Sequence, residues 1–322
     1  MKATLTLEAV LQARARIRPH IRHTPLLRFD GLDERLGCKA LLKPEMFQVT
    51  GSFKVRGALS RALLLRPEEK ERGLIASSSG NHAQALAYAG RLTGARTILV
   101  VPHNAPEIKV NRTRALGAEV ILFEGEQAAR WAFVDELIES RHYTMVHASE
   151  DPMVMAGQGT IALEILEDAP DIDTIVVPLG GGGLLSGIAA AVKEIAPHIR
   201  LVGVEPALAP KYCVSRKLGK PTKVPAGPSI ADGVREELPG ANAHGFIERW
   251  VDDLVLVEER YIQEGLRLLA EEAKLFAEGA AAVGIGAVLS GQLQVPASAH
   301  VCFVLSGGNW DLDTFIAAFN RT

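Results

Sequence analysis

The sequence predicts an α/β protein of two lobes, each a mainly parallel sheet flanked by helices. Short stretches rich in Val, Ile and Leu alternate with helix-like segments along most of the chain, as is typical of parallel α/β structure. The stretch at 174–179 is apolar on both faces, which indicates a central parallel strand, and 301–305 reads as a further buried strand. The chain has 322 residues, of which 48% are hydrophobic, enough for one large domain or two of ordinary size.

Composition excludes several classes of protein. The net charge of −3 and the absence of a Lys/Arg-rich block argue against a nucleic-acid partner. Cys38, Cys213 and Cys302 are far apart and form no CxxC pair, so we expect neither a zinc site nor disulfides, as suits a cytoplasmic protein. No apolar run reaches the roughly 18 residues of a membrane helix, and residues 280–289 are expected to form a packed core helix. The amino terminus has no signal-peptide core.

The first half of the chain starts with a helix expected at 7–18, with Thr6 as its N-cap and Glu8 in its first turn. Pro25 then favours extended structure in the residue before it. The later elements expected here are strands at 40–43, 74–76, 97–102, 120–123 and 143–146 and helices at 57–65, 83–92, 107–116 and 128–138.

The second half repeats the alternation with stronger strands. Its expected elements are strands at 174–179, 201–204, 254–257 and 301–305 and helices at 157–166, 184–195 and 259–276. The helix at 259–276 is amphipathic, and one face carries Ile262, Leu266, Leu269, Ala273 and Phe276. Residues 208–250 are rich in Pro and Gly, and we expect them to be mainly loops that border a site.

One lysine stands out in the stretch Thr-Gly-Ser-Phe-Lys-Val-Arg-Gly at residues 50–57. If Lys54 is partly desolvated, its charged form is disfavoured and its pKa falls. A neutral lysine amine forms a Schiff base with an aldehyde, such as that of pyridoxal phosphate. A surface lysine in a Gly-rich turn is the alternative that this stretch alone leaves open.

Four consecutive glycines, Gly180, Gly181, Gly182 and Gly183, lie between an expected strand and an expected helix. Their backbone N–H groups and the positive end of the helix dipole are suited to an anion. The run has neither the lysine of a nucleoside-triphosphate loop nor the GxGxxG order of a dinucleotide fold, so a small phosphorylated cofactor is favoured. The alternative is a turn that only allows tight strand–helix packing.

Polar residues follow two other expected strands. Residues 77–82 read Ser-Ser-Ser-Gly-Asn-His, which predicts either a helix cap or a site for a substrate carboxylate and a cofactor. The triplet Ser-Gly-Gly at 306–308 ends the last strand, at the sheet edge where ligands bind in open α/β folds.

The motifs together resemble the fold-type II pyridoxal-phosphate enzymes, which have the fold of the tryptophan synthase β subunit. Within them the threonine/serine dehydratase and serine racemase group is the most similar. The resemblance rests on the four stretches above and on His-Thr-Pro-Leu, Ala-Gly-Gln-Gly-Thr, Val-Glu-Pro and Ile-Ala-Asp-Gly-Val at 23–26, 156–160, 204–206 and 230–234. It covers nearly the whole chain. It implies a large lobe from residues 1–72 and 149–322 and a small mobile lobe from residues 73–148.

The resemblance also implies the roles of the site residues. Lys54 carries pyridoxal 5′-phosphate as a Schiff base and moves the α-proton, and Ser79 can act on the opposite face. The other implied contacts are Phe53 and Gly233 on the ring, Asn81 at the phenolic oxygen, Ser306 at the ring nitrogen, Gly180, Gly181, Gly182, Gly183 and Leu184 at the phosphate, and Ser78, Ser79, Asn81 and His82 at the substrate.

We therefore expect a cytoplasmic, homo-oligomeric ammonia-lyase, a dimer or tetramer, that removes water from L-threonine or L-serine and yields a 2-oxo acid and ammonia. A neutral Ser306 makes the cofactor a weaker electron sink than a carboxylate would, which favours β-elimination over transamination. The chain ends at Thr322, shortly after the last motif, so regulation by a further domain is not expected.

Three alternatives stay open. Ser79 is compatible with an amino-acid racemase. Arg130 or Arg235 could bind the second carboxylate of 3-hydroxyaspartate, or the site could take a bulkier β-substituted amino acid. A silent cofactor- or amino-acid-binding protein is the third alternative, against which intact Lys54, Asn81 and Ser306 argue.

One position departs from the family pattern. Many members bind a divalent cation through positions that correspond here to Glu205, Ala209 and Lys211. An ammonium offers no oxygen ligand and repels a cation. We therefore expect no metal. Lys211 could instead pair directly with Glu205, and the alternative is that Lys211 points to solvent while backbone donors satisfy Glu205.

Overall fold

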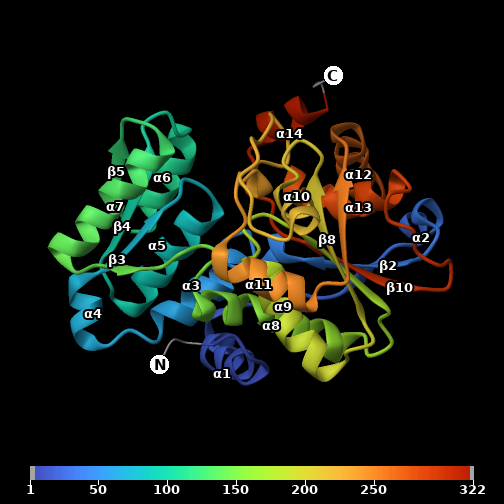
Figure 1. Cartoon of the computed structure of the whole chain (residues 1–322), viewed down its shortest axis with the longest axis horizontal. Helices are drawn as coiled ribbons and strands as arrows, with labels where there is room; N and C mark the ends of the chain where they lie inside the picture. Colours follow the sequence, from blue (N-terminus) through green and yellow to red (C-terminus); the bar gives the residue numbers. More distant parts are fainter. Residues whose placement is uncertain (1–3, 320–322) are drawn as a thin grey trace.

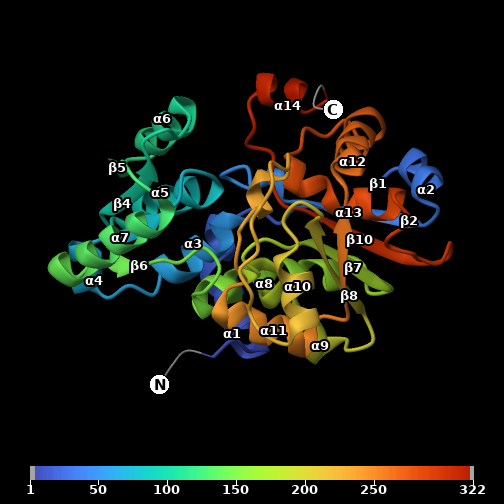
Figure 2. The ribbon, with the colours of Figure 1, turned by 45° about the horizontal axis from the view of Figure 1, so that its top comes forward.

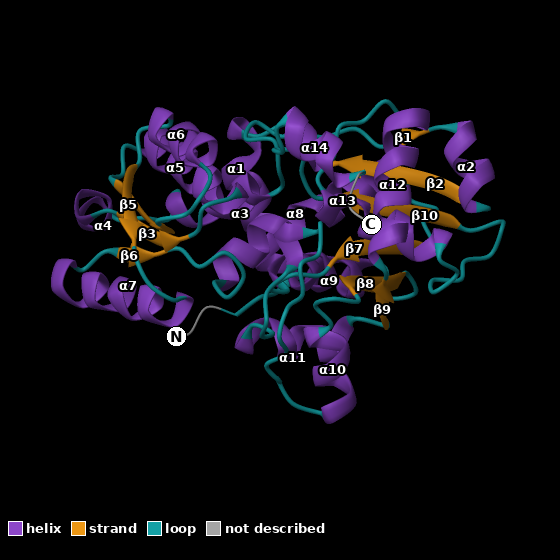
Figure 3. Cartoon of the chain, turned by 90° about the horizontal axis from the view of Figure 1, so that it is seen from above, coloured by secondary structure: helices purple, strands orange, loops and turns teal. Residues whose placement is uncertain are grey.

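The computed structural model describes residues 4–319, so residues 1–3 and 320–322, which include the two chain ends considered above, lie outside it. Its strands form a six-stranded and a four-stranded sheet. The two sheets stand at opposite ends of the molecule (Figure 1, Figure 3). Every strand pair in the described residues is parallel except β1–β2, which confirms the predicted fold class.

The six-stranded sheet has the order β1-β2-β10-β7-β8-β9. Its strands are β1 (Leu27–Arg28), β2 (Lys39–Pro44), β7 (Thr174–Pro178), β8 (Arg200–Pro206), β9 (Asp253–Val257) and β10 (His300–Leu305). The helices that accompany it are α1 (Leu7–Ile17), α2 (Asp30–Leu36), α3 (Lys54–Ala62), α8 (Pro152–Asp168), α9 (Gly183–Ile195), α10 (Lys211–Leu218), α11 (Ala241–Trp250), α12 (Glu259–Glu272), α13 (Gly279–Leu289) and α14 (Leu312–Ala318), with short 3-10 turns η1 (Arg18–His20), η2 (Glu45–Phe47) and η3 (Asp232–Val234).

The four-stranded sheet and its helices, here called the small lobe, comprise residues 74–145. Its strand order is β5-β4-β3-β6. Its elements are β3 (Leu74–Ser77), β4 (Thr97–Pro102), β5 (Glu119–Phe123), β6 (Thr144–Met145), α5 (Asn81–Thr93), α6 (Glu107–Ala115) and α7 (Gln127–Arg141), and α4 (Pro67–Arg72) precedes it.

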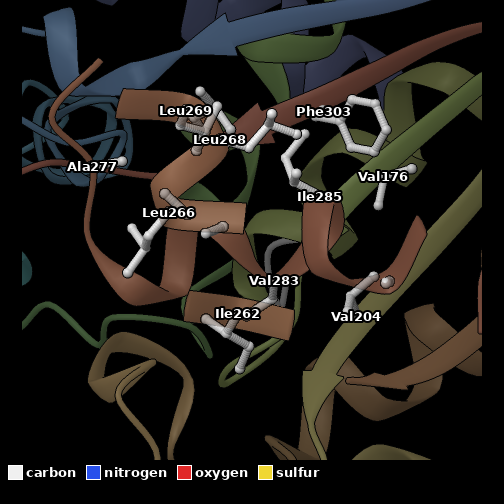
Figure 4. Packing of buried hydrophobic residues seen from close by; sticks show 14 of the residues in the cluster. Val176, Val204, Ile262, Leu266, Leu268, Leu269, Ala277, Val283, Ile285 and Phe303 are labelled. Atoms are coloured by element: carbon white, nitrogen blue, oxygen red, sulfur yellow. The ribbon is translucent and has the colours of Figure 1, made fainter. Parts of the chain in front are cut away.

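The large sheet is buried on both faces, as its apolar strands predict. In β10, Val301 and Phe303 belong to one core cluster, whereas Cys302 and Val304 belong to another on the opposite face. Figure 4 shows the first cluster, in which Phe303 lies beside side chains of α12 and α13. The Gly/Ala-rich α13 is almost entirely buried, which confirms the expected core helix. Within residues 4–319, no helix has the length and apolar character needed to cross a membrane.

Small residues bring α8 into close contact with α3 and α9. A Cβ built on Gly157 of α8 would lie 2.4 Å from the Arg56 carbonyl oxygen, and one on Gly187 of α9 would lie 2.1 Å from the Met155 carbonyl oxygen. Side chains there would push the helices apart, which explains the glycines. Since α3 lies between the lobes (Figure 1, Figure 2), this packing fixes its amino-terminal end, which carries Lys54.

The structure departs from the expected elements in several places; for example, α8 begins at Pro152 and not at Gly157, and α2, α4 and α14 were not predicted. The helix at 57–65 begins three residues earlier, at Lys54. Residues 211–218 and 241–250 form the helices α10 and α11, which were not predicted. Most of the rest of 208–250 is loop, as expected, and residues 232–236 border the cavity described below. The helix at 259–276 ends at Glu272, before Lys274 adopts a left-handed conformation with φ of 57°. As a result, Phe276 leaves the buried face and is 36% exposed.

Candidate active site

A cavity of about 560 Å³ lies between the small lobe and the large sheet. It is reached by the residues that follow the carboxyl ends of β3, β7 and β10, the edge at which α/β folds bind ligands. Every candidate site residue lines this cavity, namely Phe53, Lys54, Ser78, Ser79, Asn81, His82, Gly180, Gly181, Gly182, Gly183, Leu184, Gly233 and Ser306.

Lys54 is held at the cavity wall by the last strand. β2 and β10 are parallel neighbours, with Pro44 opposite Leu305, so the segments that follow them meet. The Phe53 N–H donates to the Ser306 carbonyl oxygen at 3.1 Å, and the Gly308 N–H donates to that of Gly51 at 3.0 Å. The Lys54 ammonium Nζ contacts only one oxygen in the described residues, the Ala148 carbonyl at 3.3 Å. Burial lowers the pKa of Lys54, against the opposing effect of Glu236, so the amine reaches its nucleophilic form more readily.

The glycine run forms a cradle of free donors. Gly182 has φ of 91°, and α9 begins at Gly183. Within residues 4–319, the N–H groups of residues 180–184 make no hydrogen bond, so they are available to an anion. A Cβ on Gly181 would lie 2.4 Å from Ser149 Oγ, and one on Gly182 would lie 2.2 Å from the Tyr212 hydroxyl. The glycines therefore let Ser149 and Tyr212 pack against this loop, and its free N–H groups are the feature that suits a phosphate group.

Asn81 opens α5 and is fixed by two residues from the other side of the cavity. Its Nδ2 donates to Glu278 Oε2 at 2.8 Å, and its Oδ1 accepts from Asn309 Nδ2 at 2.8 Å. The Asn309 N–H also donates to Glu278 Oε1 at 2.9 Å. Burial, together with the negative charge of Asp232, raises the pKa of Glu278 to about 7. The second Nδ2 hydrogen of Asn81 remains available for a ligand oxygen.

The serines of the loop before α5 do not cap that helix. Its N-cap is Gly80, and no side chain caps it, so the capping explanation of this loop was wrong. Ser78 Oγ accepts from the Gly80 N–H at 3.4 Å, and Ser77 Oγ accepts from Arg130 Nε at 2.9 Å. Arg130 is thus held by Ser77, whereas Arg235 lines the cavity.

Two histidines in the cavity are neutral. His82 Nε2 contacts the Val146 carbonyl oxygen at 2.7 Å, so Nε2 carries the hydrogen and Nδ1 is an acceptor. His147 Nδ1 accepts from the Ser149 and Glu150 N–H groups at 3.2 and 3.0 Å, and its ring stacks on Trp131. Burial and the charge of Lys54 lower the pKa of His82 to about 3 and that of His147 to about 4. Near neutral pH, therefore, neither imidazole ring adds a positive charge beside Lys54.

These histidines should make stability fall in acid. Each has a lower pKa in the folded chain than its ordinary value of 6.5, so the unfolded chain binds more protons below pH 6.5. From pH 6.5 down to about 4, each should lower the free energy of unfolding by about 1.4 kcal/mol per pH unit. Urea unfolding of the parent and of His147→Asn across this range measures the slope. An equal slope in the two proteins would contradict the shift at His147.

Lys211 and Glu205 form the predicted pair. Lys211 Nζ lies 3.1 Å from Glu205 Oε1, and both side chains are fully buried. The same ammonium donates to the Leu179 carbonyl at 3.2 Å and to the Val234 carbonyl at 3.1 Å. Leu179 directly precedes the glycine run and Val234 follows Gly233, so one cation joins the two loops that border the cavity. The remaining carboxylate contacts come from the Tyr212 and Cys213 N–H groups.

We predict that activity needs no divalent metal, because the Lys211 ammonium stands where an acidic ligand would be needed and is paired with Glu205, the carboxylate that a cation would bind. Exhaustive chelation should leave the turnover rate unchanged, and added Mg²⁺ or Mn²⁺ should not raise it. Loss of activity on chelation, with recovery on metal addition, would contradict this role of Lys211. Across residues 4–319, no cluster of three or more His, Cys, Asp or Glu side chains is arranged for a metal.

The sequence interpretation missed several residues of the cavity wall. Asn309 had a signal, because it directly follows the Ser-Gly-Gly triplet. Glu278 is a single acidic residue in an apolar stretch, which is itself unusual. The other missed lining residues include Lys109, Gln127, Trp131, His147, Ser149, Asp232 and Glu236.

Comparisons with known proteins place the geometry in context. A family model described as pyridoxal-phosphate dependent enzyme matches residues 17–307. The L-threonine ammonia-lyase of Thermotoga maritima is 39% identical over 317 residues, which cover 98% of this chain and 79% of that protein. The serine racemase of Homo sapiens is 41% identical over 314 residues, covering 95% and 92% of the two chains. The solved structure of maize serine racemase superposes with a TM-score of 0.93 at 33% identity and covers 99% of this chain and 98% of that chain.

Proposed function

This chain belongs to the family of pyridoxal-phosphate dependent enzymes, and we propose that it is an ammonia-lyase that removes water from a β-hydroxy amino acid, L-threonine or L-serine. The enamine that is released tautomerises and is hydrolysed by water at its C–N bond, so the products are a 2-oxo acid and ammonia. The observation that carries the proposal is the cavity itself, in which Lys54 with a lowered pKa faces a cradle of free N–H groups and a neutral Ser306. Relatives named L-threonine ammonia-lyase support the same reaction.

Several groups in the cavity would hold the cofactor. The N–H groups of residues 180–184 would bind its phosphate, and Phe53 and Gly233 would contact its ring. Asn81, fixed by Glu278 and Asn309, would donate to its phenolic oxygen. When bound, the cofactor supplies an electron sink for the bond that breaks at Cα.

The substrate is handled by residues of both lobes. The loop at 78–82 binds its carboxylate, with Ser78, Ser79, Asn81 and His82 lining that part of the cavity. Lys54 takes the α-proton as a base, for which its lowered pKa is suited. The electron pair left at Cα forms the Cα–Cβ double bond as the β-oxygen leaves, so a strong sink is not needed.

Ser306→Asp should slow the elimination and raise transamination as a side reaction. A carboxylate beside the ring nitrogen would hold it protonated and strengthen the electron sink. We expect elimination to fall by about tenfold, equivalent to about 1.4 kcal/mol in activation free energy. Cofactor absorbance, 2-oxo acid release and formation of the aminated cofactor are measured side by side, with Ser306→Asn as the neutral control. Equal elimination rates in Ser306→Asp and the parent would rule out this role of Ser306.

Racemisation is the second candidate, and the observation that favours it is Ser79 in the cavity wall. Relatives named serine racemase are as similar to this chain as the ammonia-lyases. A panel of L-threonine, L-serine, 3-hydroxyaspartate and bulkier β-substituted amino acids, with 2-oxo acid and D-amino acid measured together, separates the candidates. Ammonia-lyase activity predicts mainly 2-oxo acid. A preference for 3-hydroxyaspartate would point to Arg235, and no turnover by a protein with bound cofactor would indicate a silent binding protein.

We further propose that residues 73–148 move as a small domain against residues 1–72 and 149–322, and that the enzyme is a cytoplasmic homo-oligomer, a dimer or tetramer. Polar contacts join the small lobe to the rest of the chain, among them Arg112 Nη1 to the Asn309 carbonyl at 3.1 Å and Lys109 Nζ to Asp232 Oδ2 at 3.5 Å. Contacts of this kind break and re-form without exposing apolar surface, which supports motion. Small-angle scattering with and without substrate tests both the closure and the oligomeric state.

A further inference from the structure

Glu236 brings a negative charge to the phosphate cradle. A Cβ built on Gly180 would lie 2.8 Å from its Oε2, and one built on Gly181 would lie 3.8 Å from its Oε1. The side chain is exposed to the cavity, which it lines together with the whole glycine run and Lys54. In residues 4–319, no donor forms a hydrogen bond or ion pair with this carboxylate. It is therefore available to a group bound in the cradle.

The position of Glu236 is fixed by its neighbours in the chain. The Val234 carbonyl is held by the buried Lys211 ammonium at 3.1 Å. On the other side, the Glu237 carbonyl accepts from the Val224 N–H at 2.8 Å, and Glu237 Oε2 pairs with Lys223 Nζ at 3.0 Å. With its backbone tied on both sides, Glu236 cannot leave the cradle by a simple shift of the loop.

The surroundings do not neutralise this carboxylate. Lys54 is the nearby amine whose pKa Glu236 raises, and it is the residue that the proposed function commits to the cofactor. Tyr212 is buried with its pKa raised, so it stays uncharged. The titratable and charged groups around Glu236 are Lys54, His147, Glu150, Lys211, Tyr212, Asp232, Arg235 and Glu237.

A phosphate in the cradle would be negatively charged. A carboxylate and a phosphate held side by side repel each other, which disfavours the state in which both are fully ionised. A proton shared between a carboxyl and a phosphate oxygen removes the repulsion and forms a short, strong hydrogen bond. The phosphate has a second pKa near 6 in water, so holding this proton near neutral pH requires only a modest upward shift.

We propose that Glu236 and the cofactor phosphate share one proton and that this pair protonates the leaving β-hydroxyl. The inference rests on the proposed function and adds the acid that the reaction needs. The Cβ–O bond breaks, the oxygen takes the shared proton and leaves as water, and the electron pair freed by Lys54 forms the Cα–Cβ double bond. The pair then lacks one proton and Lys54 has gained one, and transfer between them through solvent restores both. Glu236 is thus a catalytic residue for elimination and is not required for removal of the α-proton.

The test compares holoenzymes of the parent, Glu236→Gln and Glu237→Gln. The two changes are chemically identical and lie one residue apart, and both side chains are away from the core, so folding should be preserved. Phosphorus NMR of the bound cofactor between pH 5 and 9 reports the ionisation of its phosphate. Glutamine removes the negative charge, so the phosphate of Glu236→Gln should lose its last proton at least about one pH unit lower than that of the parent. Glu237→Gln should match the parent.

Kinetics give the second readout. In D₂O, exchange of the α-proton of L-serine and formation of pyruvate are measured in the same sample. Glu236→Gln should lower pyruvate formation by about 10²-fold and leave the exchange rate close to that of the parent. An unchanged phosphorus titration, or equal losses of exchange and elimination, would overturn the role of Glu236. Absence of both exchange and pyruvate in the parent would instead refute the proposed function, and the phosphorus comparison would still report on the contact with phosphate.

Discussion

Lys54→Ala should reduce turnover by about 10⁴-fold or more, the largest effect expected of any single substitution here. The change removes the amine that carries the cofactor and the base that takes the α-proton, and base catalysis alone contributes up to about 10⁴-fold. The side chain has one hydrogen bond in the described residues, to the Ala148 carbonyl at 3.3 Å. Its loss should therefore leave folding intact. Steady-state release of 2-oxo acid, with circular dichroism as the check on folding, measures the effect.

Two further variants show whether charge alone explains the loss. Lys54→Arg keeps a cation but has no neutral amine near pH 7, so it should be as inactive as Lys54→Ala. Lys220→Ala changes an exposed lysine and should retain the parent rate. A Lys54→Arg enzyme with substantial turnover would show that the lysine serves only as a charge.

Lys211→Met should cost about 3–5 kcal/mol in the free energy of unfolding, because it leaves Glu205 charged and unpaired by any cation in the core. Both side chains are fully buried. The carbonyls of Leu179 and Val234 also lose their donor, so the loops on either side of the phosphate cradle should loosen and cofactor affinity should fall. Urea unfolding and cofactor titration measure the two effects.

The matched control is Lys217→Met, the same change on the same helix at an exposed position, which should stay within about 0.5 kcal/mol of the parent. Adding Glu205→Gln to Lys211→Met removes the unpaired charge and should recover part of the loss. A cost below about 1 kcal/mol for Lys211→Met would mean that the buried pair does not organise these loops.

Local signals in the sequence predicted most of the fold. Thr6 caps α1 as expected, with its side chain accepting from the Ala9 N–H, and the apolar runs became the central strands. Features set by distant contacts were not predictable. The segment that follows Ser52 turns into helix at Lys54 because the Ser306 carbonyl fixes the Phe53 N–H, a partner about 250 residues away. Likewise, α10 forms where Glu205 accepts the N–H groups of Tyr212 and Cys213.

The cavity residues likewise fall into those with a local sequence signal and those whose role depends on distant contacts. The stretches 180–183 and 50–57 each contain several unusual residues in a row, so both could be predicted as site motifs from the sequence alone. The structure brings them together at one cavity. Glu236, Glu278 and His147 are single residues whose importance depends on what lies opposite them. The raised pKa of Glu278, for example, results from burial and from the nearby charge of Asp232, and no local sequence pattern predicts either.

The most direct test of the central claim is the identity of the lysine that carries the cofactor. The holoenzyme is reduced with borohydride, which fixes the cofactor to its lysine as a stable secondary amine, and the tryptic peptides are then mapped by mass spectrometry. The account predicts a single modified peptide with the adduct on Lys54, and no such adduct in Lys54→Ala. An adduct on Lys109, the other lysine of the cavity wall, or on any lysine besides Lys54 would contradict it.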